Sequence, residues 1–212
     1  MKPQYAKIVR WVSWSIVVVA LVAGLFYAET IMGDRRCKKV EIAIDSNKSG
    51  QFLTNQEIED ILFPDKKDPI TNSPIKTINF KRIENKLEKN PYIEKAEAYA
   101  SLTGKVKVNI LERKPALRVV NGWGEQFYIS TDRVMFPLKS GCPARVMIAT
   151  GGIWLKYREG KSLNSINDTI IERSNIGSLL YLNHFINSDD LLSSLIGQIN
   201  INEDNEIELV PN

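Results

Sequence analysis

The segment 90–115 reads NPYIEKAEAYASLTGKVKVNILERKP and decides the fold of the first half of the chain. Over 105–110 every second residue is apolar, which is the period of a strand with one buried face. Thr103 and Gly104 supply turn chemistry before this strand, and another strand is expected over about 94–100. The segment therefore predicts a β-hairpin.

A strand and a helix are indicated upstream of the hairpin. Apolar residues alternate with polar or charged ones over 39–45, which predicts a further strand. Thr54 and Glu57 have the spacing of a capping box, in which each side chain bonds the backbone amide of the other at the start of a helix. Pro64 ends this helix, and the polar stretch 65–74 is expected to be a loop.

A second helix precedes the hairpin. Phe80 and Leu87 begin and end one apolar stripe. The helix is expected to end at Asn90, because Pro91 disfavours helical geometry in the residue before it. The order strand, helix, helix, strand, strand lets two helices cover one face of a three-stranded sheet. Leu87 and Val108 should then be buried where helix meets sheet.

The N-terminal region has the pattern of a membrane span. The stretch 11–28 contains no charged residue. As a helix it would be about 27 Å long, close to the hydrocarbon thickness of a bilayer. Trp11 and Tyr27 lie at its ends, where amphipathic rings favour the membrane interface. We therefore expect a cytoplasmic tail at 1–10 and a transmembrane helix at 11–32.

Two alternatives concern this N-terminal segment. A cleaved signal peptide would share the basic start, but the apolar run is long, and Phe26 and Ala28 form a poor cleavage site. Lys and Arg flank the segment on both sides, so their count does not fix its orientation. A short tail followed by a large body favours export of the body, with the N-terminus in the cytoplasm.

The second half of the chain has the pattern of a β-rich fold. Strands are expected near 117–120, 126–129 and 145–148, because Gly, Pro and Asn residues typical of hairpin turns separate them. Apolar residues also alternate over 199–201 and 207–209. These last two segments predict a final hairpin.

Two helices are expected before the final hairpin. Apolar residues from Ile176 to Leu182 recur with helical spacing. Another helix follows Ser188, whose side chain is expected to cap it, and Gly197 is expected to end it. Its buried stripe is predicted to consist of Leu191, Leu192, Leu195 and Ile196.

The charge composition argues against nucleic-acid binding. The chain has 28 Lys or Arg and 25 Asp or Glu, which gives a formal net charge of +3. That surplus corresponds to Lys2, Lys7 and Arg10, which no acidic residue accompanies in the first 28 positions. The rest of the chain is neutral, so a broad phosphate-neutralising surface is not expected.

Residues with catalytic or metal-binding chemistry are scarce. The chain has one histidine, His184, and two cysteines, Cys37 and Cys142, so neither a metal cluster nor a disulfide framework is expected. A single Cys37–Cys142 bridge is the alternative to two free thiols. His184 has no partner at a catalytic spacing, and we predict no enzyme activity, no cofactor and no metal. Trp123 and Trp154 fit core or loop packing, with interface contacts as the alternative.

A group of short motifs resembles a known family. NPYIEKA at 90–96 is similar to the family pattern N-P-[WY]-[IV]-x-x-A, and ERKP at 112–115 is similar to the exit that follows its hairpin. FYI at 127–129 and FPL at 136–138 resemble the start of its next domain. With the N-terminal segment and the element order, these motifs resemble the FtsQ/DivIB family of bacterial cell division proteins. The motif positions are Asn90, Pro91, Tyr92, Ala96, Glu112, Arg113, Pro115, Tyr128 and Pro137.

The resemblance implies an α+β fold. A single transmembrane helix would be followed by a POTRA domain of β-α-α-β-β order at 38–114. A β domain with two or more helices would occupy 115–212. Ser130 and Arg133 depart from the family pattern, which often has Asp and Gly at these positions, so the geometry of that turn is left open.

The resemblance also implies a function. The protein would be a non-enzymatic scaffold of the divisome in the bacterial inner membrane, with its bulk exported, at the septum. It would bind FtsB and FtsL, and through them help to regulate septal peptidoglycan synthesis by FtsW and FtsI. The expected mechanism is addition of a partner strand to an exposed sheet edge.

The end of the chain carries a separate expectation. Family members have further strands after the position of 207–212, and these carry the edge that binds FtsB. The β domain is therefore expected to be incomplete in the chain as written. A sheet that lacks its outer strands exposes unpaired backbone groups, so weak binding of FtsB and a tendency to aggregate are expected.

Two other functions remain open on the sequence alone. A POTRA-type factor for protein transport or outer-membrane assembly would use the same kind of edge, although the chain has one such unit. A hydrolase with a Ser/Lys pair would need a serine in a strained, glycine-flanked turn, and the sequence offers none.

Overall fold

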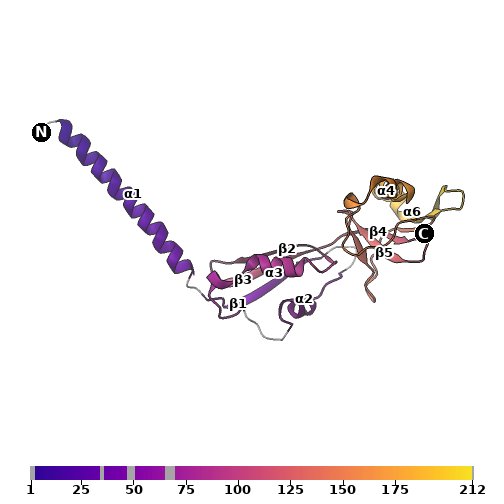
Figure 1. Cartoon of the computed structure of the whole chain (residues 1–212), viewed down its shortest axis with the longest axis horizontal. Coiled ribbons are helices and arrows are strands. Elements are labelled where there is room, and N and C mark those ends of the chain that lie inside the picture. Colours follow the sequence, from indigo (N-terminus) through magenta and orange to yellow (C-terminus); the bar gives the residue numbers. More distant parts are fainter. Residues whose placement is uncertain (1–2, 34–35, 47–50, 65–69, 212) are drawn as a thin grey trace.

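The computed structural model describes residues 3–33, 36–46, 51–64 and 70–211, with side chains at residue 11, over 13–27 and at the described positions from 36 onward. Figure 1 shows three parts in series: the long helix α1 (Pro3–Gly33), a first sheet with two α-helices, and a second sheet with three. The predicted α+β class is confirmed.

Helix α1 extends away from both sheets (Figure 1). Its described large apolar side chains, from Trp11 to Tyr27, are between 47% and 74% exposed. Of the helices formed by the described residues, none is both long and apolar enough to cross a membrane.

The first sheet has the order β1-β3-β2, with β1 parallel and β2 antiparallel to the central strand. Two α-helices and a 3-10 turn complete this part of the chain. Their bounds are β1 (Lys39–Asp45), α2 (Asn55–Leu62), η1 (Ile75–Thr77), α3 (Phe80–Leu87), β2 (Ile93–Ala100) and β3 (Lys105–Glu112). The predicted order of elements is confirmed.

The helices pack on the apolar face of this sheet. Val108, Leu87 and Ile58 are all 0% exposed and belong to one core cluster. Thr54 forms the predicted capping box, because its hydroxyl accepts from the N–H of Glu57 at 3.3 Å while its own N–H donates to the Glu57 carboxylate at 2.9 Å. The local signals of the sequence therefore place these elements correctly.

Helix α3 ends earlier than predicted. It stops at Leu87 rather than at Asn90, and Glu88 is its C-cap. The carboxylate of Glu88 accepts from the N–H of Ala96 at 3.3 Å, and the turn that follows α3 leads directly into β2. A longer helix would remove this turn.

The second sheet has the order β6-β5-β4-β7-β8-β9. Strand β7 is parallel to β4 and β8, and the other neighbours are antiparallel. The strands are β4 (Pro115–Val120), β5 (Gln126–Ser130), β6 (Met135–Pro137), β7 (Ile148–Gly151), β8 (Ile196–Ile201) and β9 (Ile207–Pro211). The helices are η2 (Leu163–Ser165), α4 (Asp168–Arg173), α5 (Ile176–Asn187) and α6 (Asp190–Leu195).

One face of the second sheet is apolar, and helices cover it. Leu117, Ile129 and Ile199 pack with Leu179 of α5 in a second core cluster. The helices α4 and α6 lie on the same side of this sheet in Figure 1. Strand β4 begins three residues after β3 ends, so the two sheets meet at a very short connection.

Two predictions in the second half were wrong in detail. The strand expected at 145–148 is β7, which begins only at Ile148, because the segment before it packs over Tyr128 with the N–H of Ala144 on that hydroxyl at 3.0 Å. Asp189 rather than Ser188 caps α6, and its carboxylate accepts from two amides of the first turn. The hydroxyl of Ser188 instead donates to a carbonyl of α5.

The buried stripe predicted for α6 was wrong for two of its four residues, because Leu192 and Ile196 pack against the second core but Leu191 and Leu195 do not. Leu191 is 67% and Leu195 is 52% exposed, because the helix is only six residues long and packs mainly against α5 and β8. Ile196 and Gly197 belong to β8 rather than to the end of the helix. Strand β6 and helix α4 had no clear sequence signal, since both are short.

A change of Val108 to Asp tests the assignment of the buried face of β3. It would put an unpaired charge at a 0% exposed position and should cost several kcal/mol, a large part of the stability of a small domain. The thermal midpoint of the purified chain should fall by at least 10 °C, and the variant should be degraded in cells. Asn109→Asp, on the opposite face, should behave like wild type; equal melting of both variants would contradict the assignment.

Candidate functional site at the sheet junction and the β9 edge

Four aromatic rings join the two sheets. Phe52, from the segment before α2, is 1% exposed and lies among Tyr92, Tyr128 and Phe136. Its ring centroid is 5.5 Å from that of Tyr92, 5.9 Å from Tyr128 and 5.8 Å from Phe136. Two of these residues precede the connection and two follow it, so the cluster buries apolar surface from both sides.

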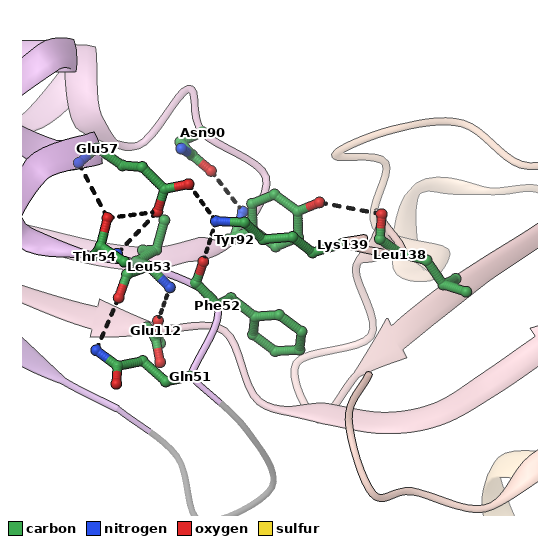
Figure 2. Close-up of polar contacts among 10 residues, drawn as sticks. All are labelled: Gln51, Phe52, Leu53, Thr54, Glu57, Asn90, Tyr92, Glu112, Leu138 and Lys139. Atoms are coloured by element: carbon green, nitrogen blue, oxygen red, sulfur yellow. Dashed lines mark hydrogen bonds and ion pairs between the residues drawn. The ribbon is translucent and has the colours of Figure 1, made fainter. Parts of the chain in front are cut away.

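Lys139 bridges the two sheets beside this cluster. Figure 2 shows its ammonium group between the carbonyl of Phe52 and the carboxylate of Glu57, and it donates to both. It also lies 5.6 Å from the centroid of the Tyr92 ring. The Tyr92 hydroxyl in turn donates to the carbonyl of Leu138 at 3.4 Å. The bond to Lys139 lowers the pKa of Glu57, and burial raises the pKa of Tyr92.

Arg113 holds the connection between the sheets. Its guanidinium donates to the carbonyls of Pro91 at 3.0 Å and Ile93 at 2.9 Å, and it forms an ion pair with Asp132 of the second sheet. The preceding residue, Glu112, is fully buried and its carboxylate accepts from the N–H of Leu53 (Figure 2). Charge-assisted bonds of this kind restrict the angle between the sheets, because they are short and directional.

Most of the family-motif positions gather at this junction. Asn90 accepts from the N–H of Tyr92 at 3.0 Å and so orients that ring, and the Tyr128 hydroxyl accepts a backbone amide from the loop before β7. Pro115 starts β4, and Pro137 pairs with Phe127 in the β5–β6 ladder. Ala96 lies apart from the others, buried in β2 under α3. The structure thus gives these positions a joining role.

Three residues of the junction were not predicted from the sequence. Phe52 and Lys139 lie in segments without periodicity, and Asp132 lies in a turn. Their partners are far away in the sequence, so no local sequence pattern predicts these contacts. A large aromatic residue two positions before the capping box is the one signal that could have drawn attention to Phe52.

The edges of the two sheets differ in how well they are covered. On the β2 edge, the N–H of Ala98 donates to Glu84 at 3.0 Å and that of Ala96 donates to Glu88, so α3 occupies these amides. The hydrogen bond from the N–H of Ala98 lowers the pKa of the Glu84 carboxyl group. On the β6 edge, the N–H of Met135 donates to the carbonyl of Lys161 at 3.0 Å. The N–H groups of Ala96, Ala98 and Met135 are therefore not available to an added strand.

Strand β9 presents the most accessible edge of the second sheet. It is last in the strand order, and all five of its residues are exposed. The N–H of Asn202 donates to the carbonyl of Glu206 in the preceding turn. Asn202 and Glu206 therefore form a hydrogen-bonded pair, and opposed pairs in an antiparallel ladder alternate between bonded and non-bonded. The pairs that contain Ile207 and Leu209 are then non-bonded, so the N–H groups of these two residues point away from β8.

The two faces of this edge have different chemistry. On the helix side, Ile207 and Leu209 are 42% and 47% exposed, and they continue the apolar face formed by their partners in β8. On the other side, the carboxylate of Glu208 accepts from the amides of Asn200 and Asn202. The hairpin also carries Glu203, Asp204 and Glu206 and contains no Lys or Arg from 197 to 211.

The remaining candidate residues do not form a reactive site. His184 is exposed on α5, and Cys37 and Cys142 are free thiols. Trp123 and Trp154 are 57% and 54% exposed and pack edge to face at 5.3 Å, so they pack on each other in surface loops rather than in the core. Within the described ranges, no group of three or more His, Cys, Asp or Glu side chains could hold a metal ion.

Removing the ring of Phe52 tests the junction. Phe52→Ala should cost about 3–5 kcal/mol, because it leaves a cavity among three aromatic rings. It should also uncouple the two sheets, so that calorimetry resolves two unfolding transitions where wild type has one. Phe80→Ala, which removes a partly buried ring of the first core alone, serves as the control. A single transition in Phe52→Ala with an unchanged midpoint would show that the sheets are coupled elsewhere.

The Glu57–Lys139 contact predicts a pH dependence. The pKa of Glu57 in the folded protein lies below its ordinary value of 4.5, so its contribution is present above that pH and is lost as the pH falls through the folded pKa. The difference in melting temperature between wild type and Glu57→Gln should therefore shrink on acidification below about pH 4.5. A difference that stays constant from neutral pH to pH 3 would contradict this.

Comparison with known proteins identifies the chain. Residues 35–111 match the POTRA-like domain model, and residues 114–212 match the model described as FtsQ/DivIB, C-terminal related. No curated protein gives a significant match. The two matches follow each other in the order implied by the sequence motifs and meet at the junction described above. The chain therefore belongs to the FtsQ/DivIB family of bacterial cell division proteins.

Proposed function

We propose that this protein is a non-enzymatic scaffold of the divisome that binds FtsB, and with it FtsL, along the outer edge of β9. Through this complex it would help to regulate septal peptidoglycan synthesis by FtsW and FtsI. The family supports a role in division with protein partners. The observation that carries the proposed mechanism is the row of outward N–H groups on β9, beside exposed apolar side chains.

Strand β9 is better suited to strand addition than the other edge strands of the two sheets. Amides of β2 and β6 already have partners from α3 and from the segment around Lys161. The strand β1 is rich in charge, with Glu41 paired to Lys105, and charged edges resist strand addition. Strand β9 combines a free ladder with apolar side chains, which is what an added strand needs in order to gain affinity and specificity.

The same edge suggests the chemistry of the partner segment. An added strand would place every second side chain beside Ile207 and Leu209, so these positions should be apolar. The intervening positions would face Glu208 and the acidic turn, so Lys or Arg is favoured there. We therefore expect an amphipathic, basic partner strand.

The predicted location follows from the N-terminal segment. We propose that 11–32 spans the inner membrane once, with 1–10 in the cytoplasm and the rest exported at the septum. The uncharged stretch 11–28 and the exposed apolar side chains of α1 support this proposal, because a soluble protein rarely leaves so much contiguous apolar surface in water. The proposed domain limits are 38–114 for the POTRA domain and 115–212 for the β domain.

Removing one outward amide tests the β9 edge. Leu209→Pro lacks the N–H that a partner would accept from, while the bonds between β8 and β9 do not use that N–H. Binding of purified FtsB–FtsL to the full chain should weaken at least about tenfold, the effect of losing roughly 1.4 kcal/mol. Leu209→Ala, which keeps the N–H, should weaken binding less. Unchanged binding by Leu209→Pro, with an intact fold by circular dichroism, would exclude this edge.

Depletion of the protein in cells separates division from transport. A divisome scaffold predicts filaments with unfinished septa when the protein is removed. The alternative, a POTRA-type transport or assembly factor, predicts envelope defects without filaments.

An alkaline phosphatase fused after Asn212 tests the proposed topology. The fusion should be active and membrane-bound if the body is exported from a single span. An inactive fusion would reverse the orientation, and an active soluble one would favour a cleaved signal.

A further inference from the structure

A second surface of the β domain has the features of a binding groove. It has a volume of about 560 Å³ and lies where the start of β4 and the end of β5 meet helix α5. Its walls are partly apolar, with Pro115, Val146 and Leu180, and partly polar, with amides of α5. The groove is far from β9 in the strand order, because β7 and β8 separate β9 from β4.

The groove is basic. Arg133 and Arg145 both line it, together with His184, and no Asp or Glu does. Within the described part of the chain, neither arginine side chain forms a salt bridge. Asp132, the acidic residue next to Arg133, is paired with Arg113 of the junction. The groove therefore concentrates positive charge that the protein itself does not neutralise.

Arg133 occupies a conformation that is unfavourable for an arginine. It sits in the turn between β5 and β6 with φ at 62°, in the left-handed region, and its N–H donates to the carbonyl of Ser130. Glycine adopts this conformation without steric cost, whereas an arginine does not. An arginine that is held there, with its side chain in an unneutralised groove, is better explained by what the side chain binds than by the needs of the turn.

We propose that this groove binds an acidic segment of a partner protein, with carboxylates at Arg133 and Arg145. The apolar wall favours a peptide over a free anion, because a phosphate or sulfate ion would leave that wall in water. Tyr181, which lines the groove, is 74% exposed. Exposed aromatic residues next to arginines are the composition of protein-binding hot spots.

The partner segment differs from the one proposed for β9. The β9 hairpin is acidic and favours a basic strand, whereas this groove favours an acidic segment. One partner could reach both surfaces only with opposite charges in different parts of its sequence. The two proposals are therefore independent, and either can fail alone.

A fluorescent peptide of alternating glutamate and leucine, titrated into the full chain, tests the groove. Arg133→Gly should leave the fold intact or raise its melting temperature, because glycine relieves the left-handed turn. It should nevertheless weaken peptide binding about tenfold, as should Arg145→Gln, since each loses a charge-assisted contact. Arg158→Gln, an exposed arginine that does not line the groove, and Leu209→Pro should bind like wild type.

Other outcomes would overturn the proposal. Equal binding by wild type, Arg133→Gly and Arg145→Gln would show that the arginines do not contact the peptide. Equal binding of a peptide of alternating lysine and leucine would show that the groove does not distinguish an acidic peptide from a basic one. Full competition by millimolar inorganic phosphate would reduce the groove to an anion site, and stronger binding to phosphatidylglycerol vesicles, lost in Arg133→Gly, would make it a lipid site.

Discussion

The packing of the Phe52 ring is the contact on which the arrangement of the two sheets depends. The connection at Arg113 and Lys114 is too short to position two domains by itself, but it brings their ends close together. Phe52 then fills the space between Tyr92 on one side and Tyr128 and Phe136 on the other. Lys139 and Arg113 add directional bonds around this apolar centre, so the contact fixes an angle as well as a distance.

This arrangement has a consequence for recognition. A scaffold that recruits partners must hold its binding surfaces at a defined distance and orientation from the membrane. The junction aligns the two domains in series, as Figure 1 shows, and leaves β9 and the basic groove on the domain that is further from α1. In the first domain, the carboxylates of Glu84 and Glu88 already accept from two amides of the β2 edge. Both proposed binding surfaces therefore lie on the second domain.

The elements and the junction were not equally predictable from sequence. The capping box at Thr54 and the alternation around Val108 are local signals, and the structure confirms both. Long-range contacts such as that between Phe52 and Phe136 produce no periodic pattern of apolar residues in the sequence, so the junction residues outside the motifs were not predicted. Leu191 had an apolar pattern that predicts burial, yet it is exposed, because burial depends on how far a helix covers the sheet rather than on its own spacing.

Amide hydrogen exchange on the full chain, with and without FtsB, shows whether FtsB binds along β9. The outward N–H groups of Ile207 and Leu209 have no partner strand within the described structure, so they should exchange fast in the free protein. FtsB should protect these two amides, while the protection of Leu53 and Ile93 at the junction should stay unchanged. Protection confined to β1, or to the first domain as a whole, would contradict binding along β9.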